Sequence, residues 1–194
     1  MSKMKLYTAR NILSLFLVAI MLVTTVGCRQ DNPVDTNEQE KITTLKLKLT
    51  PAEGRTIEAV WRDLDGPGGN PPVITPLNLR AGVTYDGEVE VLDESKVPPE
   101  DKTEEIEEEG DEHLFTYTVG GGAQGRLTIT RTDRDRNDLE IGLRFRAQVS
   151  SGAATSGTLR VILYHYSSSV RKTPALQPGP ETDIDATFPV NIAQ

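Results

Sequence analysis

Residues 83–91 have the sequence Val-Thr-Tyr-Asp-Gly-Glu-Val-Glu-Val, with a nonpolar residue or glycine at nearly every second position and mostly polar residues between them. Successive side chains of a β-strand point to opposite faces of a sheet. A period of two therefore predicts a strand with one buried face and one solvated face.

The same alternation returns in short segments elsewhere in the chain: Leu45–Leu49, Ile57–Trp61, Leu127–Ile129, Ile141–Ala147, Leu159–His165 and Ile184–Val190. Clusters of turn-forming residues separate these segments at 65–72, 120–122, 133–138 and 150–157. About eight or nine strands at this spacing predict an all-β fold, a two-sheet antiparallel Ig-like β-sandwich, over residues 42–194.

One acidic segment, residues 98–113, interrupts the alternation. Nine of the thirteen residues from Glu100 to Glu112 are acidic, and two prolines precede them. This composition predicts one short acidic helix that begins at the prolines and ends near Gly110. Ile106 is its only internal aliphatic residue, so we expect the helix to dock lightly on one end of the sandwich.

The beginning of the chain combines a cationic start, an apolar run and then Gly27-Cys28. This order is typical of a secretory signal peptide, and the run is shorter than the about 20 residues that a membrane span needs. Gly27 and Cys28 resemble the end of a bacterial lipobox, with Thr25 in place of the usual leucine. We expect residues 1–27 to be a lipoprotein signal peptide, Cys28 to be lipidated and residues 28–41 to be a flexible tether.

Charge and the residue after the cysteine indicate where the mature protein lies. Cleavage before Cys28 removes three basic residues and no acidic one, so the formal charge of -8 becomes -11. Nucleic acid and anionic lipid repel such a chain, so we expect no nucleic-acid partner and attachment to the bilayer through acyl chains. Arg29 stands where aspartate would indicate inner-membrane retention, which favours the outer membrane. The alternative is a plain secreted protein with an unpaired thiol at Cys28.

Two histidines stand at expected strand ends. His113 follows Glu112 directly, and His165 ends the segment that begins at Leu159. If these strand ends meet at one rim, two imidazoles and a carboxylate suit Zn²⁺ or another first-row divalent ion. We therefore expect His113 and His165 to be direct ligands and take Glu112 as the first candidate for the carboxylate ligand.

Further carboxylates complete this candidate set. Glu105 and Glu109 share a helix face with Glu112, because residues three or four positions apart are neighbours on a helix. Asp183 and Asp185, near the last strand, are additional candidate ligands. The alternative is a solvated acidic loop with two unrelated surface histidines.

Other motifs favour structure over chemistry. Residues 133–138 begin like a calcium loop, but Asp138 replaces the glycine at the sixth position and Arg144 replaces the bidentate glutamate. We interpret this segment as a turn, which aspartate and asparagine favour. The single cysteine is expected to be acylated and no Gly-x-Ser-x-Gly motif is present. We therefore expect the protein not to be an enzyme.

Six segments support a family resemblance: Trp61–Gly66, Thr103–Glu109, Asp111–His113, Gly142–Leu143, Ser156–Val161 and Glu181–Asp185. On these segments, residues 42–192 resemble a small lipoprotein family of Gram-negative bacteria, often labelled type 1 periplasmic binding fold superfamily proteins. The resemblance implies a partnership with TonB-dependent outer-membrane receptors and a role in metal uptake. The label implies alternating strands and helices, which this sequence lacks. Relatives also tend to have a proline soon after the second histidine, where this chain has Tyr166.

We therefore expect an outer-membrane-anchored lipoprotein that binds a divalent metal ion such as Zn²⁺ as an accessory to a TonB-dependent uptake receptor. The alternative is a non-catalytic, Ig-like protein-interaction module whose acidic segment contacts a partner protein. Metal binding would depend on the histidines and weaken below about pH 6. A charge-driven protein contact would depend on salt concentration instead.

Overall fold

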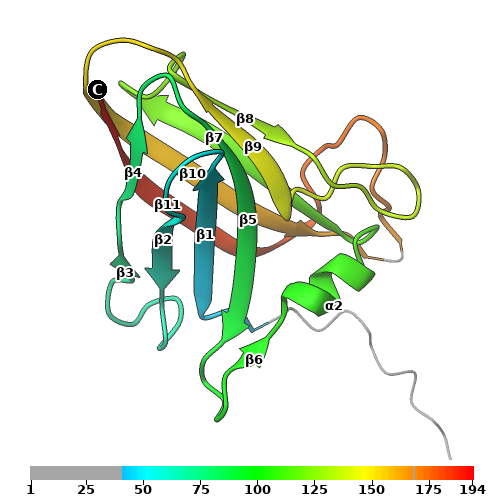
Figure 1. Ribbon diagram of the computed structural model, residues 1–194. Helices are drawn as coiled ribbons and strands as arrows, with labels where there is room; N and C mark the ends of the chain where they lie inside the picture. The colour runs from blue at the N-terminus through cyan, green and yellow to red at the C-terminus, as the bar shows by residue number, and fades with distance from the viewer. Residues whose placement is uncertain (1–40, 168) are drawn as a thin grey trace, which may run out of the picture. The chain divides into compact units, whose positions relative to one another are not determined.

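The computed structural model of the protein describes residues 41–167 and 169–194. Its strands form two sheets that face each other across a shared core (Figure 1). The predicted all-β, two-sheet fold is confirmed. The predicted signal peptide, Cys28 and the tether before Lys41 lie outside the described residues, so these remain predictions.

The two sheets take strands from all along the described chain. The first has seven strands, namely β1 (Thr44–Pro51), β2 (Ile57–Arg62), β3 (Val73–Ile74), β5 (Thr84–Asp93), β6 (Glu100–Asp101), β8 (Leu127–Arg131) and β9 (Arg144–Val149). The second has four, namely β4 (Leu77–Arg80), β7 (His113–Gly121), β10 (Thr155–His165) and β11 (Glu181–Ala193).

Strand order places β10 and β11 in the interior of the second sheet. The order is β3-β2-β1-β5-β9-β8 in the first sheet, with β6 paired to β5, and β4-β11-β10-β7 in the second. Neighbouring strands run antiparallel except for β4 and β11, which pair in parallel from Leu77 opposite Val190 onward. β10 and β11 thus each have a hydrogen-bonded neighbour on both sides over part of their length.

The core lies between the inner faces of the sheets and follows the alternation seen in the sequence. On β5 the side chains of Tyr85, Val89 and Val91 are buried, while their neighbours point outward. Phe115, Phe145 and Phe188 are among the largest side chains that are less than 2% exposed. Burial of each such side chain contributes about 1.5–3 kcal/mol, so the inner rows hold the sheets together.

The helix is shorter than predicted and begins later. Residues Glu100 and Asp101 pair with the end of β5 as β6, and only then does α2 (Thr103–Glu108) begin. The backbone N–H of Lys102 still donates to the Val91 carbonyl at 2.9 Å, so sheet pairing competes successfully with the helix up to that residue. Ile106 is fully buried and anchors the helix to the sandwich, as its position in the sequence predicts.

Gly87 leaves room for an aromatic ring. It lies opposite Phe145 in the β5–β9 ladder, and a Cβ atom at this position would come within 2.3 Å of the phenyl ring. Gly87→Ala should therefore lower the free energy of unfolding by about 1–3 kcal/mol through overpacking, measured by urea denaturation. Glu88→Ala, on the exposed face of the same strand, should change it by no more than about 0.5 kcal/mol. Equal losses in both variants would contradict the steric explanation.

Candidate metal centre

The two histidines lie side by side at one end of the second sheet. His113 begins β7, His165 ends β10, and the two residues are direct partners in the antiparallel ladder. Both side chains continue the inward-facing rows and are buried, at 0% and 3% exposure. The expectation that the strand ends meet at one rim is confirmed. The alternative of two unrelated surface histidines is wrong, because the core-facing register buries both.

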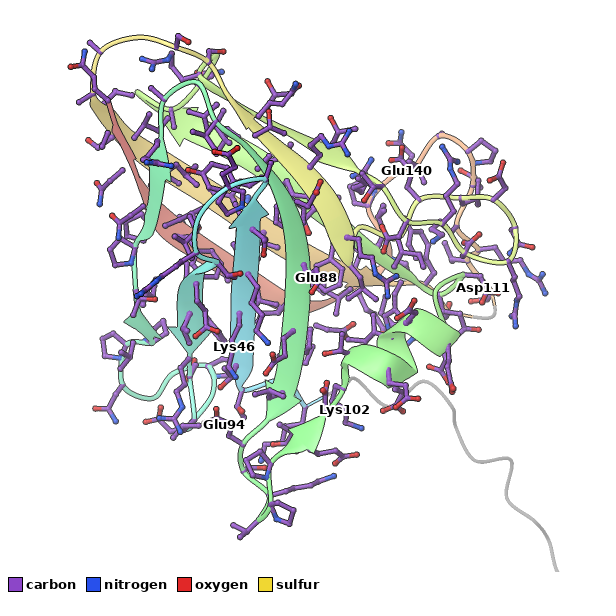
Figure 2. All side chains as sticks on the ribbon, in the orientation of Figure 1. Lys46, Glu88, Glu94, Lys102, Asp111 and Glu140 are labelled. Atoms are coloured by element: carbon purple, nitrogen blue, oxygen red, sulfur yellow. The ribbon has the colours of Figure 1, made fainter. Side chains whose placement is uncertain are left out.

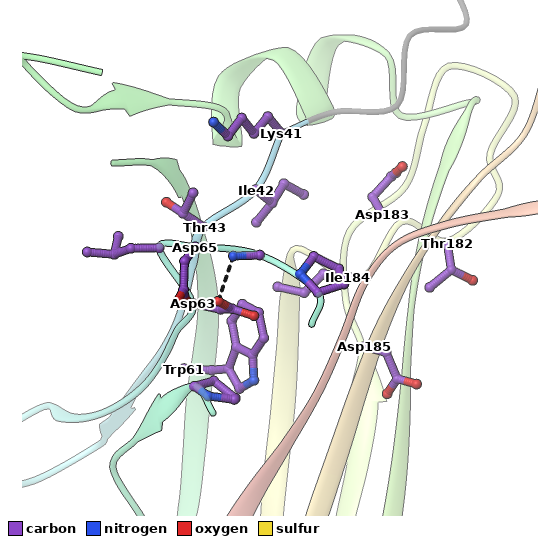
Figure 3. A pocket seen from close by; sticks show the side chains of 14 residues that line it. Lys41, Ile42, Thr43, Trp61, Asp63, Asp65, Thr182, Asp183, Ile184 and Asp185 are labelled. Carbon is purple, nitrogen blue, oxygen red and sulfur yellow. Dashed lines mark hydrogen bonds between the residues drawn. The ribbon is translucent and has the colours of Figure 1, made fainter. Parts of the chain in front are cut away.

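A β-bulge brings Asp183 to the same place. Leu163 pairs with Ile184 and Tyr164 pairs with Thr182, so Asp183 is the extra residue on β11 with no partner on β10. An extra residue breaks the alternation of faces and can redirect a side chain. Asp183 and Ile184 consequently leave β11 on one side, and Thr182 and Asp185 on the other (Figure 3). The carboxylate of Asp183 is fully buried.

These three side chains form a compact donor set. One ligand atom from each of His113, His165 and Asp183 lies within 4.8 Å of the others. The two imidazole rings are stacked, with centroids 4.8 Å apart and planes at 24°. His165 Nδ1 lies 4.0 Å from Asp183 Oδ1, which is too far for a hydrogen bond. The groups are gathered together without being bonded to one another.

Five buried polar atoms of this set have no hydrogen-bond partner among the described residues: His113 Nε2, His165 Nδ1, His165 Nε2, Asp183 Oδ1 and Asp183 Oδ2. Buried polar groups in folded proteins nearly always have partners, because each unpaired one costs about 1–3 kcal/mol. Five such atoms on three clustered side chains, with one ligand atom of each residue within 4.8 Å of the others, indicate a ligand that is bound by nitrogen and oxygen atoms.

The end of α2 fixes the orientation of His113. Its Nδ1 atom lies 3.1 Å from the main-chain carbonyl oxygen of Glu109, the residue that caps the helix. A carbonyl can only accept, so Nδ1 donates its hydrogen and Nε2 keeps the lone pair. Histidines that bind metals usually hold their second nitrogen in this way. Burial, with the nearby His165, lowers the pKa of His113 to about 4, so the ring is neutral at pH 7.

The buried carboxylate of Asp183 lowers the stability of the fold. Burial raises the pKa of its carboxyl group to about 6, despite the opposing effect of His165. At pH 7 the group is nevertheless mostly ionised, buried and without a hydrogen-bond donor among the described residues. Such an arrangement lowers stability, and a bound cation would remove the cost.

The four remaining predicted ligands are not members of the compact cluster. Glu112 Oε2 lies 3.8 Å from His165 Nε2 and its side chain is 40% exposed, so it stands at the solvent side of the cluster. Glu105 pairs with Lys102 at 2.7 Å. Glu109 contributes its main-chain carbonyl rather than its exposed carboxylate. Asp185 lies on the outer face of β11 and accepts from Arg160 Nε at 2.8 Å, so its predicted role as a ligand is wrong.

Much of the acidic segment is neutralised within the molecule. Lys102 and Asp111, which lie on either side of α2 within this segment, are labelled in Figure 2. Glu107 accepts two hydrogen bonds from the Arg144 guanidinium, at 2.8 and 3.0 Å, which lowers the pKa of Glu107. Asp111 pairs with Arg136 at 2.5 Å. Arginine side chains thus neutralise part of the acidic segment. The local sequence does not reveal these pairs, because Arg136 and Arg144 are distant from the segment in the chain.

A groove opens beside Asp183 (Figure 3). It has a volume of about 670 Å³ and lies where the start of β1 and the end of β2 face β11. Its walls include Ile42, Trp61 and Asp63 from the first sheet side and Ile184 from the second. Of the three clustered residues, Asp183 alone lines this groove.

Comparison with family models, with curated proteins and with solved structures finds no match to this chain. No helix within residues 41–167 and 169–194 is long and apolar enough to span a membrane. The interpretation of the cluster therefore rests on its own geometry.

The cost of the buried carboxylate can be measured. The folded-state pKa of Asp183, about 6, exceeds the unfolded value of about 3.9, so the destabilising contribution of this one group is largest above pH 6 and fades as pH falls toward 4. Asp183→Asn should therefore raise the free energy of unfolding by about 1–3 kcal/mol at pH 7.5 with a chelator present, and by less at pH 4. Urea denaturation at both pH values measures the difference.

Asp185→Asn is the matched control, two residues away and on the exposed face. It removes an exposed ion pair and should lower stability by no more than about 1 kcal/mol. A stability loss in Asp183→Asn at pH 7.5 would show that the carboxylate has a protein partner after all.

Proposed function

We propose that this protein binds one divalent metal ion, Zn²⁺ or a similar first-row ion, through His113, His165 and Asp183. The carrying observation is the set of five buried, unpartnered nitrogen and oxygen atoms at one end of the second sheet. Glu112, at the solvent side, would supply a fourth ligand or hold a bound water.

The chemistry of the donors fits this class of ion. Two imidazoles and a carboxylate suit Zn²⁺, whereas Ca²⁺ and Mg²⁺ prefer oxygen donors alone. Zn–N and Zn–O bonds of about 2.0–2.2 Å place neighbouring ligand atoms about 3.4 Å apart in a tetrahedral site. The observed limit of 4.8 Å means that ligand atoms approach one another by up to about 1.4 Å on binding, a change that rotations about side-chain bonds can supply.

Burial favours binding over catalysis. The side chains of His165 and Asp183 are 4% and 0% exposed, and His113 is fully buried. Catalytic zinc sites keep an open position for substrate, whereas closed sites hold the metal itself. A role as a metal-binding protein rather than an enzyme fits the cluster best.

The wider role in this proposal rests on the sequence. The lipobox at Cys28 and the family resemblance support an outer-membrane lipoprotein that serves as an accessory to a TonB-dependent uptake receptor. The rival role, a protein-interaction module using the acidic segment, ranks second, because Lys102 and Arg144 already neutralise Glu105 and Glu107.

Metal binding has a direct test. Calorimetric titration of Zn²⁺ into the full-length protein in detergent at pH 7.5 should give one-to-one binding. His113→Ala, His165→Ala and Asp183→Asn should each weaken it by more than about 100-fold, because loss of a ligand exceeds the 10–100-fold cost of losing a supporting residue. Asp185→Asn, on the outer face of the same strand, should bind like the wild type.

Stability gives an independent readout of the same site. Zn²⁺ at about 100 times its dissociation constant should raise the free energy of unfolding by about 2.7 kcal/mol, and the gain should vanish in the three ligand variants. Binding that is weak and indifferent to all three substitutions, but sensitive to salt, would contradict the metal site and favour the interaction module.

Membrane attachment is tested separately. Cys28→Ala should move the protein from the membrane fraction to the soluble fraction, because acyl chains and not an anionic-lipid contact are expected to hold this acidic chain. Fractionation and mass spectrometry of the N-terminal peptide measure both effects. An unmodified Cys28 in the mature wild-type protein would show that it is a plain secreted protein.

A further inference from the structure

A buried lysine, Lys172, contacts the main chain of His113. Lys172 belongs to the 169–180 loop between β10 and β11, and its side chain is 1% exposed. Its ammonium group donates to three main-chain carbonyls and pairs with one carboxylate: Gly110 O at 2.5 Å, His113 O at 3.0 Å, Glu140 O at 3.0 Å and Asp135 Oδ2 at 2.9 Å. A single Nζ atom thus joins three separate segments of the chain.

The carboxylate partner is itself fixed. Asp135 Oδ1 accepts from the backbone N–H groups of Asn137 and Leu139, at 2.8 and 2.9 Å. In the turn at residues 133–138, which begins like a calcium loop, Asp135 therefore binds the ammonium group of Lys172. Removing a charged group from water is expensive, and it is tolerated where every donor is satisfied and a counter-charge is present. Lys172 meets both conditions.

The ammonium group of Lys172 donates hydrogen bonds to the main chain of the turn that precedes β7 and ends at His113. Residues Gly110 to His113 connect α2 to β7, and Lys172 binds the carbonyls at both ends of this turn. The imidazole Nδ1–H of His113 donates a hydrogen bond to the carbonyl of Glu109, one residue before the turn. Holding the main chain here fixes both the ring and its hydrogen-bond acceptor.

The same loop also contacts the second histidine and leads to the third ligand. A Cβ atom on Gly179 would lie 2.5 Å from the His165 carbonyl oxygen, so the loop runs directly against that residue. Tyr166, which follows His165, donates its hydroxyl hydrogen to the Gln177 carbonyl. The loop then enters β11, which carries Asp183 in its bulge.

We infer that Lys172 is a positioning residue of the metal centre, whose ammonium group fixes the main chain of His113 and thereby pre-organises the buried donor set. This inference rests on the proposed metal binding. Pre-organisation lowers the cost of ordering the ligands, so loss of the ammonium group should weaken metal binding in the 10–100-fold range typical of residues that support metal ligands.

Two variants test the inference. Lys172→Met keeps the length of the side chain and removes the charge, and Asp135→Asn keeps Lys172 but removes its counter-charge. The full-length protein in detergent is titrated with Zn²⁺ in competition with a chromophoric chelator. Both variants should bind Zn²⁺ about 10–100-fold more weakly than the wild type. If Lys172→Met fails to fold, Asp135→Asn still gives the answer.

The matched control is Leu159→Ala, a core variant on β10 away from the histidine end. It should lose stability but keep its zinc affinity within about threefold, because additivity holds for distant sites. An equal loss of zinc affinity in this control and in the two test variants, Lys172→Met and Asp135→Asn, would overturn the positioning role and leave only a contribution to overall stability. Unchanged zinc affinity in the two test variants would also overturn it.

A metal-free measurement separates this inference from the proposed function. The imidazole ¹⁵N shifts of His113 should show a single Nδ1–H tautomer in the wild type, because Nδ1 faces the Glu109 carbonyl, and a mixture of tautomers in Lys172→Met. A wild type that binds no zinc would overturn the proposed function and, with it, the role at a metal centre. Zinc binding with an unchanged tautomer and affinity in the variant would overturn only the role of Lys172.

Discussion

The pairing register of β10 with its two neighbours is the constraint on which the site depends. The ladder to β7 sets His165 opposite His113, and the ladder to β11 contains the bulge that turns Asp183 inward. Because side chains alternate with a period of two, a slip of one residue in either ladder would move a ligand to the solvated face. The core residues that precede His165 on β10, such as Leu163 and Val161, are fully buried and therefore hold the register that the site needs.

The site also shows a balance between stability and function. A buried, ionised Asp183 beside imidazole nitrogens that have no hydrogen-bond partner among the described residues lowers the stability of the protein. Large, fully buried aromatic side chains in the core and a buried ion pair between Lys172 and Asp135 are the parts of the surrounding fold that offset this loss of stability. Local arrangements that cost stability and are held by a stable frame are typical of functional sites.

The sequence predicts the sandwich and includes all three clustered residues among its candidate ligands, but it does not rank Asp183 above the other carboxylates. Physical reasons explain what it misses. Alternation identifies β1, β5 and β10, since each has one buried face. In a regular strand Asp183 and Asp185 would share a face, so the pattern cannot separate them; only the bulge does, and it depends on pairing with a strand about twenty residues away. Lys172 carries no local signal, because its acceptors are mostly main-chain carbonyls, which every residue possesses.

The parallel pairing of β4 with β11 has a consequence for how the molecule assembles. β11 lies between β4 and β10, so β4 is not joined to the β10–β7 pair until residues 181–193 form their strand. Contacts so distant in sequence form slowly, because a long loop must close before they contribute. Until that closure, β4 has no neighbour in its sheet, and the two histidines of the β7–β10 pair lack Asp183 beside them. A chain interrupted before this strand would leave β4 unpaired and one edge of β10 exposed. The assembled cluster of His113, His165 and Asp183 is therefore also a sign that β11 has joined the sheet.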